Sequence, residues 1–373
     1  MRILIDYRPA LRARTGAGLW IAGLVEAMAA SHDPPPAEVT VFSSSWKDRL
    51  PPLGLAGVSE VDHRVPGRVL NWLWHRREWP SAERLTGRTF DVVHSPSPLL
   101  IPTRSAAQMV TVHDLDFLDH PERGVREIRR DYAALAGAHA RRAHGVVVSS
   151  ATTARAVSER LGVPSDRITV CPVGAPAWPA RPDLTAGRHI LFVGTLGARK
   201  NVDRLLTAYA ALRAANPDAP PLLLAGGDGP DVAPGLASPG IEGVERLGYV
   251  EAPQLRELYE SAMMLVLPSL DEGFGIPVLE AMTVGVPVVV SDRGSLPEVA
   301  GEAGVRVDPL DPEAITAAMA GLLAAPARRA RLAEAGIARA SGFNWSASAG
   351  ALRAAYTAAC RRRRDEGADA DRG

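Results

Sequence analysis

One stretch constrains the fold more than any other: residues 264–291, MLVLPSLDEGFGIPVLEAMTVGVPVVVS. A short apolar run at 264–267 precedes a loop with two glycines, Pro277 suits the first position of a helix, and Gly285 ends that helix. The next run, 286–290, is apolar and β-branched, as in a strand that is buried on both faces. This order of strand, loop, helix and strand predicts an α/β fold with a parallel sheet.

The loop and the helix start in this stretch form a predicted binding crevice. Ligands of such sheets bind beyond the carboxyl ends of the strands, where Asp271, Glu272 and the glycine loop 273–275 fall. The helix that begins near Pro277 directs free backbone N–H groups to the same place, and these groups bind anions. Glu280 lies one turn into this helix among apolar neighbours, where a carboxylate needs hydrogen-bond donors such as adjacent sugar hydroxyls. The glutamates therefore indicate either a site for a phosphorylated, hydroxyl-rich ligand or an ion pair beside a solvated loop acid.

The wider pattern around these glutamates carries a family resemblance. E-G-F-G-I-P-V-L-E, with Glu272 and Glu280 at its ends, and the following A-M-x-x-G-x-P-V-V-x-S resemble the E-x7-E signature of the retaining family 4 glycosyltransferases. The resemblance covers nearly the whole chain and is most specific at 193–300. It implies a GT-B fold, in which two Rossmann-like β/α/β domains face each other across an interdomain cleft and a C-terminal helix crosses back to the N-terminal domain.

Two adjacent cations precede a second predicted helix. Only Lys47 and Lys200 are lysines among the 42 lysines and arginines of the chain. Arg199 and Lys200 stand just before Asn201, a predicted helix cap, so they could bind a diphosphate or be solvated loop charges. The segment V-G-T-L-x-x-R-K-N resembles the diphosphate-binding loop of the family. The resemblance implies that both cations neutralise charge on the departing diphosphate.

Further site residues are expected in both domains. A G-x-G loop, Gly16 and Gly18, lies between the first strand and the first helix, where backbone can approach a ligand or simply turn tightly. His94 and His113 fall at strand ends; we expect a structural role for His94. The segment T-V-H-D-L-x-F-L-x-H-P-E around His113 resembles the acceptor-domain motif of the family, whose histidine lies near the transferred sugar. The resemblance also assigns the nucleobase pocket to Gly248, Tyr249 and Val250, the sugar hydroxyls to Glu272 and the ribose to Glu280, and it brings Gly273, Phe274, Gly275 and Ile276 into the substrate site.

The expected domain boundaries follow composition and pattern. Residues 1–176 form an N-terminal Rossmann-like domain that binds the acceptor, and residues 177–342 a C-terminal one that binds the nucleotide sugar. The proline- and glycine-rich segment 174–187 is the expected hinge. Residues 343–360 are the expected crossover helix, and the charged tail 361–373, which lacks apolar anchors, is expected to be disordered.

Three further segments within the two domains are predicted to be helical. Residues 125–142 and the alanine-rich segment 314–340 are each expected to be helical. Residues 68–85 combine tryptophans with arginines at helical spacing. This segment is either a helix that contacts an anionic membrane surface weakly or an ordinary helix that covers the first domain, and Pro80, which cuts the helix short, favours the second.

The resemblance implies a reaction that needs no metal or other cofactor. It is the transfer of a hexose from a nucleotide-diphosphate sugar, GDP-mannose first and a UDP-sugar next, to a hydroxyl of a glycan, glycolipid or metabolite with retention of configuration. The alternatives are a Rossmann NAD-dependent oxidoreductase, whose third fingerprint glycine is missing after Gly18, and a non-catalytic hinged sugar-binding protein. The 42 acidic residues balance the basic ones, so no overall charge favours nucleic acid. The two cysteines, the start MRILIDYRPA and the lack of a long apolar run predict a cytoplasmic protein.

Overall fold

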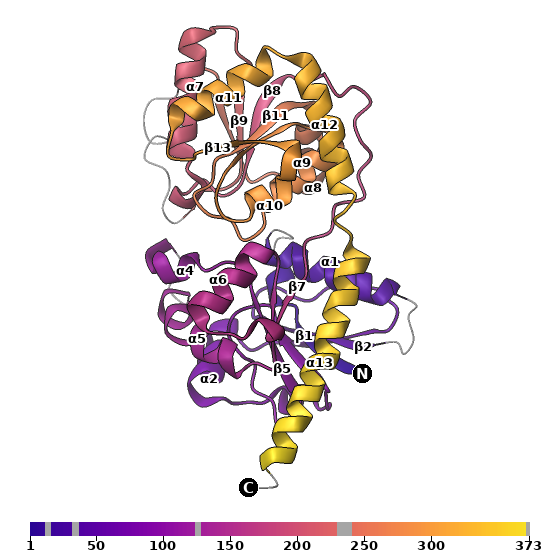
Figure 1. Cartoon of the computed structure of the whole chain (residues 1–373). Helices are drawn as coiled ribbons and strands as arrows, with labels where there is room; N and C mark the ends of the chain where they lie inside the picture. The colour runs from indigo at the N-terminus through magenta and orange to yellow at the C-terminus, as the bar shows by residue number, and fades with distance from the viewer. Residues whose placement is uncertain (12–15, 32–36, 124–127, 230–240, 371–373) are drawn as a thin grey trace. The chain divides into compact units, whose positions relative to one another are not determined.

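The computed structural model describes residues 1–11, 16–31, 37–123, 128–229 and 241–370 (Figure 1). The chain divides into two compact units, Met1–Gly174 with Asn344–Gly373, and Ala175–Phe343. We call them the first and the second domain. The predicted boundaries at 176 and 343 lie close to this division.

The first domain is built on a seven-stranded parallel sheet in the order β3-β2-β1-β4-β5-β6-β7. Its inner strands are almost fully buried, which explains their continuous apolar sequences. The strands are β1 (Arg2–Asp6), β2 (Glu38–Ser44), β3 (Val58–His63), β4 (Val92–Ser95), β5 (Ala107–Val112), β6 (Gly145–Val148) and β7 (Ile168–Val170).

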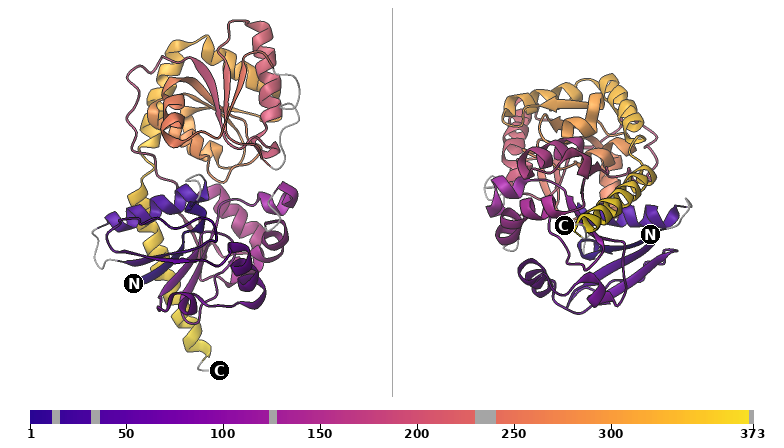
Figure 2. Two further views of the ribbon diagram at one scale, coloured as in Figure 1. Left: turned by 180° about the vertical axis from the view of Figure 1, so that it is seen from behind. Right: turned by 60° about the horizontal axis from the view of Figure 1, so that its bottom comes forward.

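Helices cover both faces of this sheet (Figures 1 and 2). α1 packs against α13 on one face, whereas α5 packs against α6 on the other. The helices are α1 (Ala17–Ala30), α2 (Gly67–Arg77), α3 (Ala82–Thr86), α4 (Asp116–Asp119), α5 (Ala133–Arg142), α6 (Ala151–Leu161) and α13 (Trp345–Ala370).

The second domain has a six-stranded parallel sheet in the order β10-β9-β8-β11-β12-β13. The order reverses between β8 and β11, so the loops that follow these two strands meet at the switch point where ligands of such sheets bind. The strands are β8 (His189–Val193), β9 (Leu222–Ala225), β10 (Val244–Gly248), β11 (Ala262–Leu267), β12 (Val288–Ser291) and β13 (Gly304–Val307).

The helices of the second domain also form two layers. α7 and α11 pack together on one face of the sheet, and α8, α9 and α12 lie on the other (Figure 1). The helices are α7 (Val202–Ala215), α8 (Ala252–Ser261), α9 (Ile276–Val284), α10 (Leu296–Ala300), α11 (Pro312–Leu323) and α12 (Pro326–Ala340).

Two predicted helices differ from the structure. The segment 314–340 forms two helices, because Pro326 occupies the first turn of α12 and cannot continue α11. In the segment 125–142, residues up to 127 lie outside the described part, and the rest is a π-helical turn, Ile128–Tyr132, followed by α5. The helix in the tryptophan-rich segment 68–85 is cut short before Pro80, as predicted: α2 stops at Arg77, and α3 begins at Ala82.

The prediction of a disordered tail from residue 361 is wrong as far as Ala370. α13 continues unbroken to that residue. Arg362 donates hydrogen bonds to the carbonyl oxygens of His144, at 3.0 Å, and of Asp166, and the Glu366 carboxylate lies 3.2 Å from His144 Nε2. Polar contacts with the first domain therefore hold a segment that has no apolar anchor.

Candidate functional site

The switch point of the second sheet brings the predicted cations and Glu272 together. Arg199 and Lys200 lie in the loop after β8, and Glu272 lies in the loop after β11. The Glu272 carboxylate accepts hydrogen bonds from Lys200 Nζ and, at 3.2 Å, from Arg199 Nη1. Ser269 Oγ donates to the same carboxylate at 2.7 Å. These side chains form what we call the cation cluster: Arg199, Lys200 and Glu272.

Glu272 is held in its ionised form. Its side chain is 7% exposed, and this burial favours the neutral acid, but Lys200 and Arg199 more than offset the effect and lower the pKa of Glu272 to about 2. A carboxylate with such a pKa is a poor proton acceptor near neutral pH. It orients the two cations, and the cluster keeps one net positive charge.

The backbone around the cluster is fixed by the loop after β12. Ser295 donates to the Glu272 carbonyl oxygen from its N–H at 3.0 Å and from its hydroxyl at 2.8 Å. Gly294 has a φ of 60°, and a Cβ there would lie 2.7 Å from Glu272 N. Only glycine allows this approach.

Asn201 is the N-cap residue of α7, as predicted, but its side chain does not cap the helix. Its φ is 59°, and its side chain makes no capping hydrogen bond to α7. Instead, Nδ2 donates to Pro268 O at 3.0 Å and to Pro309 O at 2.6 Å. Asn201 therefore ties the loop of Arg199 and Lys200 to the loop of Glu272.

The helix α9 begins four residues after Glu272. Pro277 in its first turn has no N–H group, and the N–H groups of Val278 and Leu279 donate to Gly275 O at 3.0 and 3.4 Å. The N-cap of α9, Gly275, has a φ of 100° and provides no side-chain cap. Gly273 and Ile276 are partly exposed. The Phe274 side chain is 7% exposed and packs edge-to-face on Phe343, with ring centroids 5.6 Å apart. The Phe274 side chain is therefore part of the packing around Phe343 and does not face a ligand.

Glu280 lies on α9 and is 8% exposed. Tyr259 Oη donates to Oε2 at 2.8 Å and is its only donor among the described residues. Burial raises the pKa of Glu280 to about 7, although the bond from Tyr259 acts in the opposite direction. When ionised, the carboxylate can therefore accept further hydrogen bonds, for example from a ligand.

The residues predicted for the nucleobase lie at the end of the edge strand β10 and directly after it. Gly248 has a φ of 68°, and its carbonyl accepts from Gly226 N at 2.7 Å. Tyr249, which is 56% exposed, and Val250 line a pocket of about 760 Å³ together with Gln254 of α8.

In the first domain, His113 presents an unsatisfied nitrogen. It follows β5 and packs edge-to-face on Trp20, with ring centroids 5.3 Å apart. Burial lowers its pKa, and the ring makes a hydrogen bond to the Pro96 backbone, whereas the buried Nε2 has no partner in the described part of the chain. The neutral ring can therefore accept a hydrogen bond from a ligand hydroxyl at Nε2. His94 is structural, as expected, with Tyr356 Oη 2.7 Å from Nδ1 and Thr111 Oγ1 2.8 Å from Nε2.

The glycine loop lies at the start of α1, after β1. Gly16 is the N-cap, with φ 50° and ψ −122°, a conformation that L-residues avoid. A Cβ there would meet nothing within 4 Å, so the backbone geometry and not crowding requires glycine. Gly18 is buried in the first turn of α1.

Comparison with known proteins identifies the family. The family model "Glycosyl transferases group 1" matches residues 187–325, and "Glycosyltransferase Family 4" matches residues 15–177. The O-antigen chain mannosyltransferase B of Escherichia coli is 30% identical over 92% of this chain and 96% of that protein. The chain belongs to the family 4 glycosyltransferases. The predicted family and the transfer of a glycosyl group are confirmed at this level.

Solved structures confirm the GT-B fold of this glycosyltransferase. Sucrose-phosphate synthase from Thermosynechococcus elongatus matches with a TM-score of 0.75 at 21% identity, over 95% of this chain and 98% of that one. HepE from Anabaena in complex with UDP-glucose matches with a TM-score of 0.68 at 17% identity, over 96% of this chain and 99% of that one.

Sequence reasoning placed the cations and glutamates but missed their support. It did not find the supporting roles of Ser269, Ser295 or Tyr259. Among the described residues, no three His, Cys, Asp or Glu side chains are grouped so that they could hold a metal ion. No helix in the described ranges is long and apolar enough to cross a membrane.

Proposed function

We propose that this glycosyltransferase moves a hexose from a nucleotide-diphosphate sugar to a hydroxyl acceptor with retention of anomeric configuration and without a metal ion. The observation that carries the proposal is the cation cluster beside the start of α9. Two oriented cations with a net positive charge, beside the positive end of the α9 dipole, match the charge of a departing diphosphate.

Each site residue has a role in this proposal. Arg199 and Lys200 stabilise the diphosphate as the bond from the anomeric carbon to its phosphate oxygen breaks, while the acceptor oxygen bonds to that carbon. The acceptor proton passes to the released phosphate, since the low pKa of Glu272 makes it a weak base. Glu272 holds the cations and meets the sugar hydroxyls.

Two further contacts position the donor. Glu280 accepts hydrogen bonds from the ribose hydroxyls at the acceptor positions that the bond from Tyr259 does not use. Nε2 of His113 accepts a hydrogen bond from a sugar hydroxyl. The Gly16 and Gly18 loop approaches the ligand through its backbone, and Gly248, Tyr249 and Val250 receive the base.

The donor we propose first is GDP-mannose, with a UDP-sugar next. The mannosyltransferase of Escherichia coli supports the first, and the UDP-glucose complex of HepE supports the second. The acceptor is a hydroxyl of a glycan, glycolipid or metabolite, and we place the reaction in the cytoplasm. Family membership sets aside the oxidoreductase and the non-catalytic binding protein.

A thermal-shift panel tests the proposal. The purified protein is heated with GDP, UDP, ADP, dTDP or NAD, each with and without EDTA. A ligand at about 100 times its Kd stabilises the folded state by about 2.7 kcal/mol. We expect one nucleoside diphosphate to stabilise the protein equally with EDTA, and the matching sugar donor to give a product with unchanged anomeric configuration by NMR. Stabilisation that EDTA abolishes would contradict the metal-free scheme, and an inverted product would contradict retention.

A further inference from the structure

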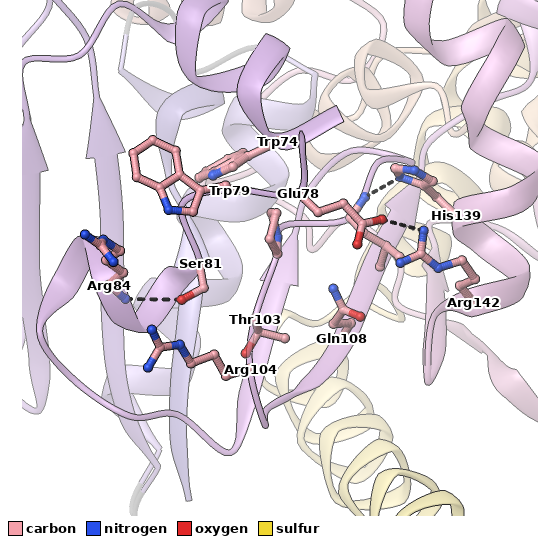
Figure 3. Close-up of a pocket in the computed structure, with 12 residues that line it drawn as sticks. Trp74, Glu78, Trp79, Ser81, Arg84, Thr103, Arg104, Gln108, His139 and Arg142 are labelled. Atoms are coloured by element: carbon pink, nitrogen blue, oxygen red, sulfur yellow. Dashed lines mark hydrogen bonds and ion pairs between the residues drawn. The ribbon is translucent and has the colours of Figure 1, made fainter. Parts of the chain in front are cut away.

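A cavity of about 330 Å³ opens on the first domain, and none of the candidate site residues lines it (Figure 3). Its volume is at the small end of the range of about 300–1,000 Å³ for small-molecule sites. It is formed by the end of α2, the start of α3, the segment before β5 and the end of α5. The lining residues are Trp74, Glu78, Trp79, Ser81, Arg84, Leu100, Pro102, Thr103, Arg104, Gln108, His139 and Arg142.

This cavity lies at the amino ends of the strands, whereas His113 lies at their carboxyl ends. Gln108, which lines it, is near the beginning of β5, whereas His113 follows the end of the same strand. A strand rises about 3.3 Å per residue, so these two positions are roughly 16 Å apart. The cavity is therefore separate from the acceptor side of the proposed reaction site.

An aromatic ring forms one wall of the cavity. Trp79 is 49% exposed, and the Arg84 guanidinium lies over its ring, 5.6 Å from the centroid. The buried Trp74 lies beside Trp79, as Figure 3 shows. The indole N–H of Trp74 donates a hydrogen bond to Pro80 O at 3.0 Å. The π face of an indole carries partial negative charge, which attracts the C–H groups on the face of a sugar ring.

Two of the guanidiniums in the cavity have no carboxylate partner. Arg142 pairs with Glu78 at 2.8 Å. Arg84 and Arg104, by contrast, form no ion pair with any described residue. The nearby Glu83 carboxylate accepts instead from the Thr103 hydroxyl and from the backbone N–H of Arg104, at 3.1 and 3.2 Å. The cavity thus has an excess of positive charge on groups that suit phosphate or carboxylate.

Polar groups between these cations can meet hydroxyls. Gln108 donates from Nε2 to Ile101 O at 2.8 Å, and its side-chain oxygen makes no hydrogen bond with any described residue. His139 accepts at Nδ1 from Leu100 N at 2.9 Å, and burial together with Arg142 lowers its pKa to about 4, so the ring is neutral. Ser81 and the Glu78 carboxylate also line the space, as Figure 3 shows.

We propose that this cavity binds an acidic or phosphorylated saccharide. Trp79 takes the ring face, Arg84 and Arg104 take the anionic group, and Gln108 and Glu78 take hydroxyls. In the working enzyme, the site holds part of a glycan acceptor away from the point of transfer and raises the local concentration of its growing end. This last role rests on the proposed function, whereas the binding itself does not.

A saccharide explains the cavity better than a membrane surface does. Val69 and Trp72 of α2, 48% and 45% exposed, could meet a bilayer, but they do not line the cavity. The ring of Trp79 is held against Arg84 within a hollow, and the Glu78 carboxylate beside it can accept hydrogen bonds from the hydroxyls that a saccharide supplies.

Calorimetric titration of the full chain tests binding. The probes are an α-mannose tetrasaccharide with one terminal 6-phosphate, the same tetrasaccharide without phosphate, inorganic phosphate, and vesicles of phosphatidylglycerol and phosphatidylcholine. The variants are Arg84→Gln with Arg104→Gln, Trp79→Ala, and Trp79→Phe, which keeps a ring. Arg155→Gln, an exposed arginine on α6 outside the cavity, is the matched control. Circular dichroism checks that each variant is folded.

We expect the phosphorylated tetrasaccharide to bind the native chain and the control equally. The double arginine variant should bind about 30-fold or more weakly, because two charge-assisted hydrogen bonds are lost. Trp79→Ala should weaken binding and Trp79→Phe should restore much of it. The stabilisation by a nucleoside diphosphate should stay the same in all variants, so a failure of the cavity can be told apart from a failure of the reaction site.

Four results would overturn the inference. They are unchanged affinity in the double variant, equal affinity for the neutral tetrasaccharide, equal affinity for inorganic phosphate alone, and binding to the anionic vesicles in place of the saccharides. The last two would make the cavity a bare anion site or a membrane contact.

Discussion

At the scale of single residues, the charge state of Glu272 determines how the site can work. The carboxylate is buried but paired with two cations, so it stays ionised at neutral pH and holds both in place. Removing one partner of such a buried pair leaves an uncompensated charge, which costs more than the pair itself contributes. Substitutions in the cation cluster should therefore affect stability and catalysis together.

Lys200→Ala tests whether this cation stabilises the negative charge of the departing diphosphate. We expect kcat to fall by about 10²–10³-fold, the loss seen when a group that stabilises a developing oxyanion is removed. Lys47→Ala is the matched control, because Lys47 is the only other lysine and is exposed in the first domain. Steady-state kinetics on folded protein decide: equal rates for the two variants would remove Lys200 from the mechanism.

Glu280 should make stability depend on pH in the opposite sense to an ordinary carboxylate. Its pKa is raised from 4.5 to about 7, so between these values the folded protein holds a proton that the unfolded chain releases. The free energy of unfolding should therefore fall as pH rises from about 4.5 to 7, by up to about 3 kcal/mol, and level off above.

Glu280→Gln should remove this part of the pH dependence. Urea unfolding of both proteins at pH 5, 6, 7 and 8 measures the difference, and Glu298→Gln, a partly exposed acid on α10, is the control. Parallel curves for the native protein and Glu280→Gln would show that Glu280 is ionised throughout.

The site residues were predictable to different degrees. Glu272, Glu280, Arg199 and Lys200 stand out because their neighbours form a distinctive local pattern. Their mutual contacts do not, since Lys200 and Glu272 are separated by 72 positions and meet only because β8 and β11 are adjacent. The bond from Tyr259 to Glu280 and the bridging role of Asn201 depend on the same tertiary packing.

At the scale of elements, loops at the carboxyl ends of neighbouring strands form the site. Buried parallel strands have continuous apolar sequences, which is why these elements could be predicted. Ends of helices were harder. The predicted single helix 314–340 overlooked Pro326, a local signal for the break between α11 and α12. The extension of α13 depends on contacts that no local pattern contains.

Two helical glycines allow a matched test of the packing of α13 on α1. Gly350 of α13 has open space around its Cβ position, so Gly350→Ala should stabilise the protein by about 0.5–1 kcal/mol through helix propensity alone. At Gly23 of α1, a Cβ would lie 2.5 Å from the Trp345 ring. Gly23→Ala gains the same propensity but should lose about 1–3 kcal/mol to overpacking.

Thermal unfolding of the two variants gives the answer. Opposite shifts in Tm are expected, and a rise in both would mean that Trp345 does not lie against α1.

At the scale of the whole molecule, the last turns of α13 add polar contacts between this helix and the rest of the first domain. Truncation after Cys360 should lower the free energy of unfolding by about 1–2 kcal/mol, because hydrogen bonds from a charged group are worth more than exposed ion pairs. Arg362→Ala should reproduce most of this loss, since Arg362 supplies the bonds to the His144 and Asp166 carbonyls. Arg361→Ala, an exposed neighbour, should have little effect. Urea unfolding of the three variants and the native protein measures the change in the free energy of unfolding. A truncated chain as stable as the native one would mean that residues 361–370 do not stabilise the fold.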